Sequence, residues 1–76
     1  MNKQRRGELA KVLDLLQGVR DMLESAKDDE EMTFDNFPES LQESVRGEAM
    51  QEAIDNMESA LDSIDEAISS VEEAMA

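Results

Sequence analysis

Hydrophobic residues recur with helical spacing along most of the chain. In the N-terminal third they alternate by three and four residues, like the a and d positions of a heptad, at Leu9, Val12, Leu16, Val19, Leu23 and Ala26. This pattern predicts a helix over residues 3–27. A longer pattern of the same kind reaches the C-terminus, at Ile54, Met57, Leu61, Ile64, Ile68, Val71 and Met75. The predicted fold class is therefore all-α, within a single helical domain of residues 1–76.

Residues 28–37 interrupt this periodicity. The run Asp28–Glu31 is a block of like charges that repel one another, and Asp35 and Asn36 follow it. Pro38 suits the first position of a new helix, where its missing N–H would have no partner anyway. We therefore expect a connector over 28–37 and a second helix over 38–75. Gly47 costs about 1 kcal/mol in a helix interior, so a kink near residue 47 is expected.

The flanks of the two apolar patterns complement each other. In the second helix Ala53, Ala60, Ala67 and Ala74 repeat on one flank, and Glu58, Asp65 and Glu72 repeat on the other. An antiparallel offset that sets Leu16 opposite Ile64 brings Arg20 near Glu58 and Arg6 near Glu72. The same offset sets Leu15 and Met22 against Ala67 and Ala60. The sequence thus predicts an antiparallel helical hairpin, whose second helix comes from the same chain or from a neighbour.

Two helices alone make a thin core. Below roughly 70–80 residues a lone core rarely supplies more than about 3–5 kcal/mol, and the chain has 76 residues and no cysteine for a disulfide. We therefore expect the chain to be a homo-oligomer, in which hairpins assemble into a four-helix bundle or a larger helical oligomer. The residues predicted for the oligomer core are Leu9, Leu16, Leu23, Ile54, Leu61, Ile64 and Ile68.

The charge is strongly negative and unevenly placed. The formal net charge is −13, and every Lys and Arg except Arg46 falls within residues 1–27. Such a charge disfavours direct binding to nucleic acid or to an anionic membrane, and it favours basic partners. No apolar run approaches the length of a bilayer span and no signal peptide is recognisable, so a cytoplasmic location is expected.

The residue types disfavour catalysis. The chain has no His, Cys or Tyr that could act as a nucleophile or activate one, and carboxylates on an exposed helix keep ordinary pKa values. A carboxylate-bridged di-iron site needs Glu-x-x-His, and the acidic run at residues 28–39 lacks the glycine of an EF-hand loop. We therefore expect no enzyme activity, no metal site and no cofactor.

Two groups of residues are candidates for binding a partner. The aromatic rings of Phe34 and Phe37 either anchor a partner or plug the open end of the hairpin. The acidic row on the second helix either keeps the surface soluble or imitates the phosphates of a nucleic acid. The residues predicted for binding are Phe34, Asp35, Asn36, Phe37, Leu41, Asp62 and Asp65.

The segment Phe34–Ser44, which reads FDNFPESLQES, is followed by Arg46-Gly47-Glu48 and the acidic heptads. With them it resembles a family of short uncharacterised acidic helical proteins from phages and prophages of Gram-positive and gut bacteria. The resemblance implies a mobile genetic element as the source, and small accessory phage proteins often bind and block host machinery. The leading hypothesis is an oligomeric binding protein that inhibits or sequesters a host component in the host cytoplasm, for example a defence protein that it contacts through an acidic surface. The alternatives are a structural or adaptor module that only assembles, and a sponge for a small anionic nucleotide signal, in which Lys3, Arg5 and Arg6 from several protomers would converge.

Overall fold

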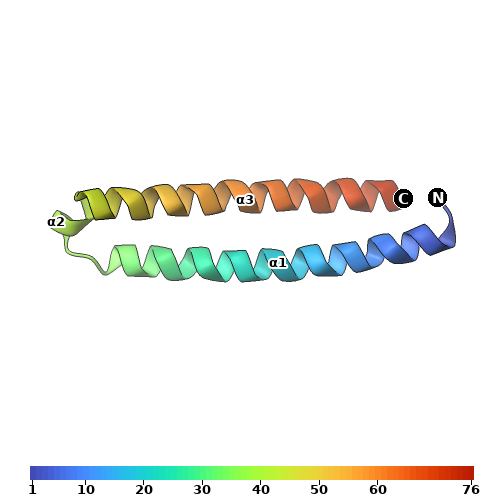
Figure 1. The fold of residues 1–76 in the computed structure, drawn as a ribbon, viewed down its shortest axis with the longest axis horizontal. Helices are drawn as coiled ribbons and strands as arrows, with labels where there is room; N and C mark the ends of the chain where they lie inside the picture. The colour runs from blue at the N-terminus through green and yellow to red at the C-terminus, as the bar shows by residue number, and fades with distance from the viewer.

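The chain forms two long antiparallel helices joined by a short corner. The computed structural model describes residues 1–76, in the order α1 (Lys3–Asp35), α2 (Glu39–Gln42) and α3 (Val45–Met75), with no strand (Figure 1). This confirms the all-α prediction and places the hairpin within one chain. The result is a rod with extents of 58 × 14 × 13 Å, in which both termini lie at the end opposite α2.

α1 begins at the predicted residue and ends later than predicted. Asn2 caps it, because its side chain accepts a hydrogen bond of 2.8 Å from the backbone N–H of Arg5. The helix then continues to Asp35, so the expected end at residue 27 and the connector over 28–37 are wrong. Two contacts explain the extension. Lys27 Nζ lies 3.5 Å from Glu31 Oε1 one turn later and offsets part of the repulsion among the carboxylates, and Phe34 is half-buried on the same face of the helix.

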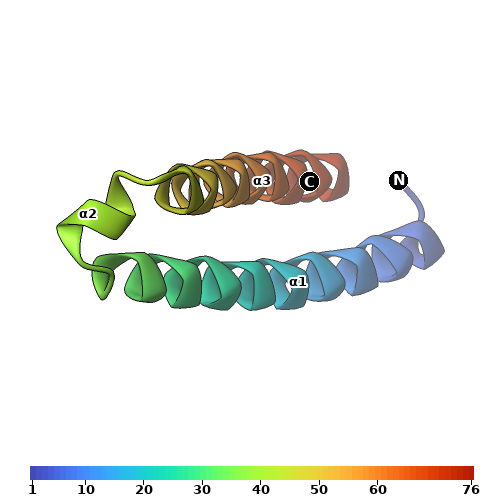
Figure 2. The same cartoon turned by 60° about the vertical axis from the view of Figure 1, so that its left-hand side comes forward.

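The predicted second helix is divided in two. α2 is a single turn after Pro38, and the helical path breaks at Glu43 and Ser44 before α3 begins (Figure 2). Ser44 caps α3, since its Oγ accepts a 3.2 Å hydrogen bond from the N–H of Gly47. The break therefore lies three residues before the kink expected near residue 47, and its cause is the serine cap rather than the flexibility of glycine.

Gly47 has a different role, which is to allow close packing. It is buried in the first turn of α3, against the last turn of α2. A Cβ atom at this position would lie 2.1 Å from the carbonyl oxygen of Gln42 and 2.5 Å from that of Leu41. No side chain fits between these backbone atoms, so the corner depends on glycine here.

The two long helices share one apolar seam. Only Ile54 and Leu61 are fully buried, with 3% and 7% of their surface exposed. The half-buried apolar residues beside them are Leu9, Leu13, Leu16, Leu23, Phe34, Met50, Met57, Ile64, Ile68, Val71 and Met75. Every residue predicted for the oligomer core therefore lies in the seam or at its edge, where it packs within a single chain.

The register of the hairpin differs from the prediction by one heptad. Arg20 pairs with Asp65 and Lys27 with Glu58, so the expected approach of Arg20 to Glu58 is wrong. Arg6 has no ion-pair partner, so its expected pairing with Glu72 is wrong too. The cause is the longer α1, which moves the turn toward the C-terminus. Because seam residues repeat every seven positions, a shift of one heptad keeps leucines facing isoleucines.

Gly47→Ala should destabilise the corner. Overpacking of a tight site typically costs about 1–3 kcal/mol, and here the added methyl group would meet backbone rather than a movable side chain. The matched control is Gly7→Ala, because nothing lies within 4 Å of a Cβ at Gly7. That variant should gain up to about 1 kcal/mol from helix propensity. Thermal unfolding followed by circular dichroism measures both, and equal shifts in the same direction would contradict the packing at the corner.

Candidate interaction surfaces

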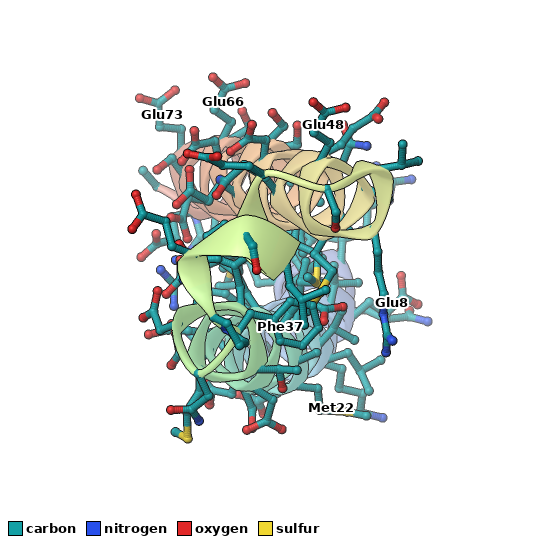
Figure 3. The ribbon with its side chains drawn as sticks, turned by 90° about the vertical axis from the view of Figure 1, so that its left-hand side faces the viewer. Glu8, Met22, Phe37, Glu48, Glu66 and Glu73 are labelled. Atoms are coloured by element: carbon teal, nitrogen blue, oxygen red, sulfur yellow. The ribbon has the colours of Figure 1, made fainter.

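A row of large apolar side chains on α1 is left uncovered by the hairpin. We call it the α1 stripe: Val12, Leu15, Val19 and Met22, which are 39%, 69%, 51% and 74% exposed. Their spacing of three and four residues puts them on one face of the helix, and Met22 points away from α3 in Figure 3. The expected packing of Leu15 and Met22 against the alanines of α3 is therefore wrong, because α1 turns Leu13, Arg20 and Lys27 toward α3 instead.

The α1 stripe and the alanine flank of α3 lie on the same side of the hairpin. The ion pairs Arg20–Asp65 and Lys27–Glu58 mark one side of the seam. The 3.6-residue period of a helix places the α1 stripe on the other side of the seam, away from these ion pairs. The same period places the alanines of α3 on that side too. Among these alanines Ala60 and Ala74 are exposed. One long side of the molecule is therefore apolar and contributed by both helices.

The opposite side is held by a small ionic network. Arg20 bridges the two helices, with its Nε 2.5 Å from Asp65 Oδ1 and its Nη1 2.5 Å from Glu24 Oε2. The hydrogen bond from Arg20, and then its charge, hold the pKa of Asp65 below the ordinary value. The hydrogen bonds from Asp65 and Glu24 raise the pKa of Arg20 in turn.

Lys27 forms the second link between the helices. Its Nζ lies 3.6 Å from Glu58 Oε1 on α3, in addition to its contact with Glu31. Desolvation opposes the charge of Lys27, but the neighbouring carboxylates outweigh it, so that the pKa of Lys27 lies above its ordinary value. The carboxylates of both links are exposed to water and the two bases are half-buried, so the links set the register of the hairpin more than they stabilise it.

The turn between the helices is organised by Gln42. Its Nε2 donates hydrogen bonds of 3.1 Å to the carbonyl oxygen of Phe34 and 3.2 Å to that of Phe37, both near the C-terminal end of α1, where carbonyls lack helical partners. The guanidinium of Arg46 lies 5.3 Å from the centre of the Phe37 ring. Both phenylalanines are half-buried, and Leu41 is 46% exposed. Sequence reasoning missed Gln42, because a glutamine in a polar segment carries no signal of its own.

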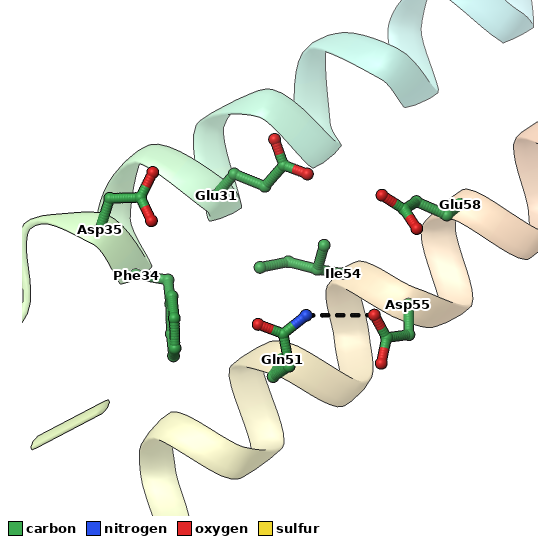
Figure 4. A pocket seen from close by; sticks show the side chains of 7 residues that line it. All are labelled: Glu31, Phe34, Asp35, Gln51, Ile54, Asp55 and Glu58. Carbon is green, nitrogen blue, oxygen red and sulfur yellow. Dashed lines mark hydrogen bonds between the residues drawn. The ribbon is translucent and has the colours of Figure 1, made fainter. Parts of the chain in front are cut away.

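A shallow groove lies between α1 and α3 next to this turn (Figure 4). Phe34 and Ile54 form its floor, and carboxylates surround them. The lining residues are Glu31, Phe34, Asp35, Gln51, Ile54, Asp55 and Glu58. Gln51 donates a 3.1 Å hydrogen bond to Asp55. No group of three or more potential ligands in the structure could hold a metal ion, whereas an acidic rim over an apolar floor suits a lysine or arginine side chain with its aliphatic stem.

The exposed side of α3 carries carboxylates along most of its length, from the edge of the groove, where Asp55 lies, to the surface opposite α1. We call it the acidic face: Glu48, Glu52, Asp55, Asp62, Glu66 and Glu73, all exposed. Glu48, Glu66 and Glu73 point away from α1 in Figure 3. No basic side chain forms an ion pair with any of them. Of the two acidic residues predicted for binding, Asp62 belongs to this face, whereas Asp65 lies at the edge of the seam and is occupied by Arg20.

The remaining predicted residues are spread over the molecule. Asp35 and Asn36 are exposed at the turn, at the opposite end from the chain termini. Of the three basic residues at the start of α1, Lys3 and Arg6 are three positions apart and share one face of the helix, whereas Arg5 lies on another face. Within one chain they do not converge into an anion site.

Neither long helix contains an apolar segment of the length required to cross a bilayer. Comparisons of the chain with protein-family models, with curated proteins and with solved structures find no match.

Asp65→Asn should lower the melting temperature at neutral pH, because it removes the partner of Arg20 on α3. The matched control is Asp62→Asn, which removes one negative charge from an unpaired residue and should leave the melting temperature unchanged or raise it. The pair contributes above the ordinary pKa of Asp65, 3.8, and its contribution is lost as the pH falls through the lowered pKa. The difference between wild type and Asp65→Asn should therefore vanish in strong acid. A difference that persists there would contradict the ion pair.

Proposed function

We propose that this protein is a non-enzymatic, homo-oligomeric binding protein that captures a basic partner protein. The observation that carries the proposal is the division of the hairpin into two unlike surfaces. One side exposes the α1 stripe, which water does not favour, and the acidic face of α3 exposes carboxylates without counter-charges. The first surface suits assembly and the second suits electrostatic capture.

The chemistry of the side chains supports binding rather than catalysis. A catalytic acid, base or nucleophile usually has a pKa shifted by burial or by a close charge. In this protein the shifted groups are Arg20, Lys27 and Asp65, and each takes part in an exposed ion pair between the helices. Their shifts are explained by the hairpin itself.

The proposed partner is a host protein. The support is the resemblance of the Phe34–Ser44 segment to phage and prophage proteins, together with a net charge of −13. A phage-borne protein of this kind would act in the host cytoplasm by inhibiting or sequestering its partner, for example a defence protein with a basic functional surface. The second candidate is an adaptor that only assembles, which the α1 stripe favours equally.

Assembly is tested by mass. At micromolar concentration, light scattering should give a mass above that of one 8.5 kDa chain. The variant Leu15→Gln/Met22→Gln should return to the mass of one chain, because both side chains are exposed in the hairpin and only a neighbouring copy would cover them. The double variant Asp14→Gln/Asp21→Gln, on the outer side of α1, is the control and should keep the wild-type mass. A wild-type protein that is monomeric and fully helical would refute assembly.

Partner capture is tested by reversing charge on the acidic face. Asp62→Lys/Glu66→Lys should weaken capture of host protein by about tenfold or more, since rim charges act at long range and are screened by salt. Asp14→Lys/Asp21→Lys makes the same change of charge on α1 and should leave capture intact. Retention on immobilised protein is measured over a range of salt concentrations. Oligomers that retain nothing would favour the adaptor, and equal loss in both variants would rule out the acidic face as the binding site.

A further inference from the structure

The heptad pattern of the α1 stripe continues into charged residues at both ends. Toward the N-terminus the next positions are Arg5 and Glu8, and toward the C-terminus they are Ala26 and Asp29. Arg5 and Asp29 are exposed, and neither side chain has an ion-pair partner within the chain. The apolar stripe is thus followed by Glu8 and then a base, Arg5, at its N-terminal end, and by Ala26 and then an acid, Asp29, at its C-terminal end.

Along the whole of α1 the charge changes from basic at the N-terminal end to acidic at the C-terminal end. Its first nine residues, 3–11, carry four basic residues and one acid, and its last eight, 28–35, carry five acids and no base. A second α1 placed parallel to the first would bring base to base and acid to acid. An antiparallel one brings each end against its opposite.

We propose that the occupant of the α1 stripe is the α1 helix of a second copy of this chain, packed antiparallel about a two-fold axis. This inference rests on the self-assembly in the proposed function and assigns its interface. A single register satisfies the pattern: Val12 faces Met22 of the partner subunit, and Leu15 faces Val19 of the partner subunit. The same register brings Arg5 opposite Asp29 of the partner subunit. In antiparallel coiled coils such a and d positions face each other in successive layers, and two-fold symmetry forms every contact twice.

The area that the single chain leaves exposed fits such an interface. The hairpin exposes 5550 Å², whereas a compact protein of its mass exposes about 4,700 Å². The excess is similar to the roughly 800 Å² that each partner buries in a stable interface. The contact from Arg5 to Asp29 would be about 36 Å long at about 1.5 Å per residue, and the exposed alanines of α3 on the same side leave room for a close neighbour.

The acidic face remains outside this interface. It lies on α3 and away from the side of the hairpin that carries the α1 stripe, so both copies would present it to solvent. A dimer formed through α1 therefore displays two acidic faces for the basic partner proposed above. Docking of two acidic faces against each other would be opposed by like charges.

Single-cysteine variants test the register, since the protein has no cysteine of its own. In the antiparallel register, Val12 and its symmetry mate are offset by ten residues, or about 15 Å, too far for a disulfide, which needs Cα atoms within about 7 Å. A mixture of Val12→Cys and Met22→Cys should therefore form the mixed disulfide at least about tenfold faster than Val12→Cys forms a disulfide with itself. Faster self-linkage of Val12→Cys would indicate a parallel pair and overturn the proposal.

A charge swap tests the ends of the interface. Arg5→Glu and Asp29→Arg should each weaken dimerisation by about tenfold, because each creates two like-charge contacts, and Arg5→Glu/Asp29→Arg together should restore it. Sedimentation equilibrium gives the dissociation constants. If the swap restores nothing while the wild type is oligomeric, this interface is wrong and self-assembly stands. If the wild type is monomeric at micromolar concentration, self-assembly fails as well, and the stripe would then belong to the apolar face of another protein.

Discussion

The thinness of the seam is the constraint on which the rest of the structure depends. A hairpin gives each helix a single neighbour, so only one stripe per helix can be covered, and only Ile54 and Leu61 are fully buried. In α3 one stripe holds all the large apolar side chains except Val45, and the rest of the helix carries mainly alanine, serine and acidic residues. α1 has two adjacent stripes and only one partner, and its second stripe remains open. The difference between the two helices thus gives the molecule an apolar side. The α1 stripe stays exposed because a hairpin provides α1 with only one neighbouring helix.

The sequence predicted the hairpin but not its register, for a physical reason. Leu9, Leu16 and Leu23 repeat every seven residues, as do Ile54, Leu61 and Ile68, so sliding one helix by a heptad exchanges equivalent layers at little cost. What decides between such registers is the length of the turn and the ion pairs beside it. Each offset offers two ion pairs, Arg6–Glu72 and Arg20–Glu58 in the predicted register and Arg20–Asp65 and Lys27–Glu58 in the observed one, so the charge pattern alone could not decide. The position at which α1 ends decides between the registers. That position depends on the repulsion among the carboxylates of residues 28–31, which the charge of Lys27 and the burial of Phe34 offset.

The corner shows the other limit of sequence reasoning. Pro38 predicts the start of α2 from the sequence. The roles of Gln42, Ser44 and Gly47 depend on contacts that exist only in the folded corner. The sequence predicts a kink at Gly47, because glycine is a poor helix former. In the structure it is the tightest point of the corner, since backbone atoms occupy the place of its missing Cβ. The candidate binding residues Phe34 and Phe37 also contribute to the corner, because their carbonyl groups accept hydrogen bonds from Gln42 and both residues are half-buried at the turn.

Charge links the fold to its proposed partners. The bases that enter ion pairs, Arg20 and Lys27, lie at the seam, where they neutralise acids on the flank of α3 next to α1. The acids on the outer side of α3 have no counterpart, because the other bases of α1 lie beyond the reach of these carboxylates. Part of the net charge of −13 therefore lies unpaired on an exposed surface that a second protein can approach. A basic partner would meet this field before any contact forms, and its association should accelerate as salt is lowered. Apolar attraction on the other side of the rod is short-ranged and takes effect only when surfaces are in contact. The proposed assembly and the proposed capture would thus use different forces on different sides of the rod, and mutations should separate them.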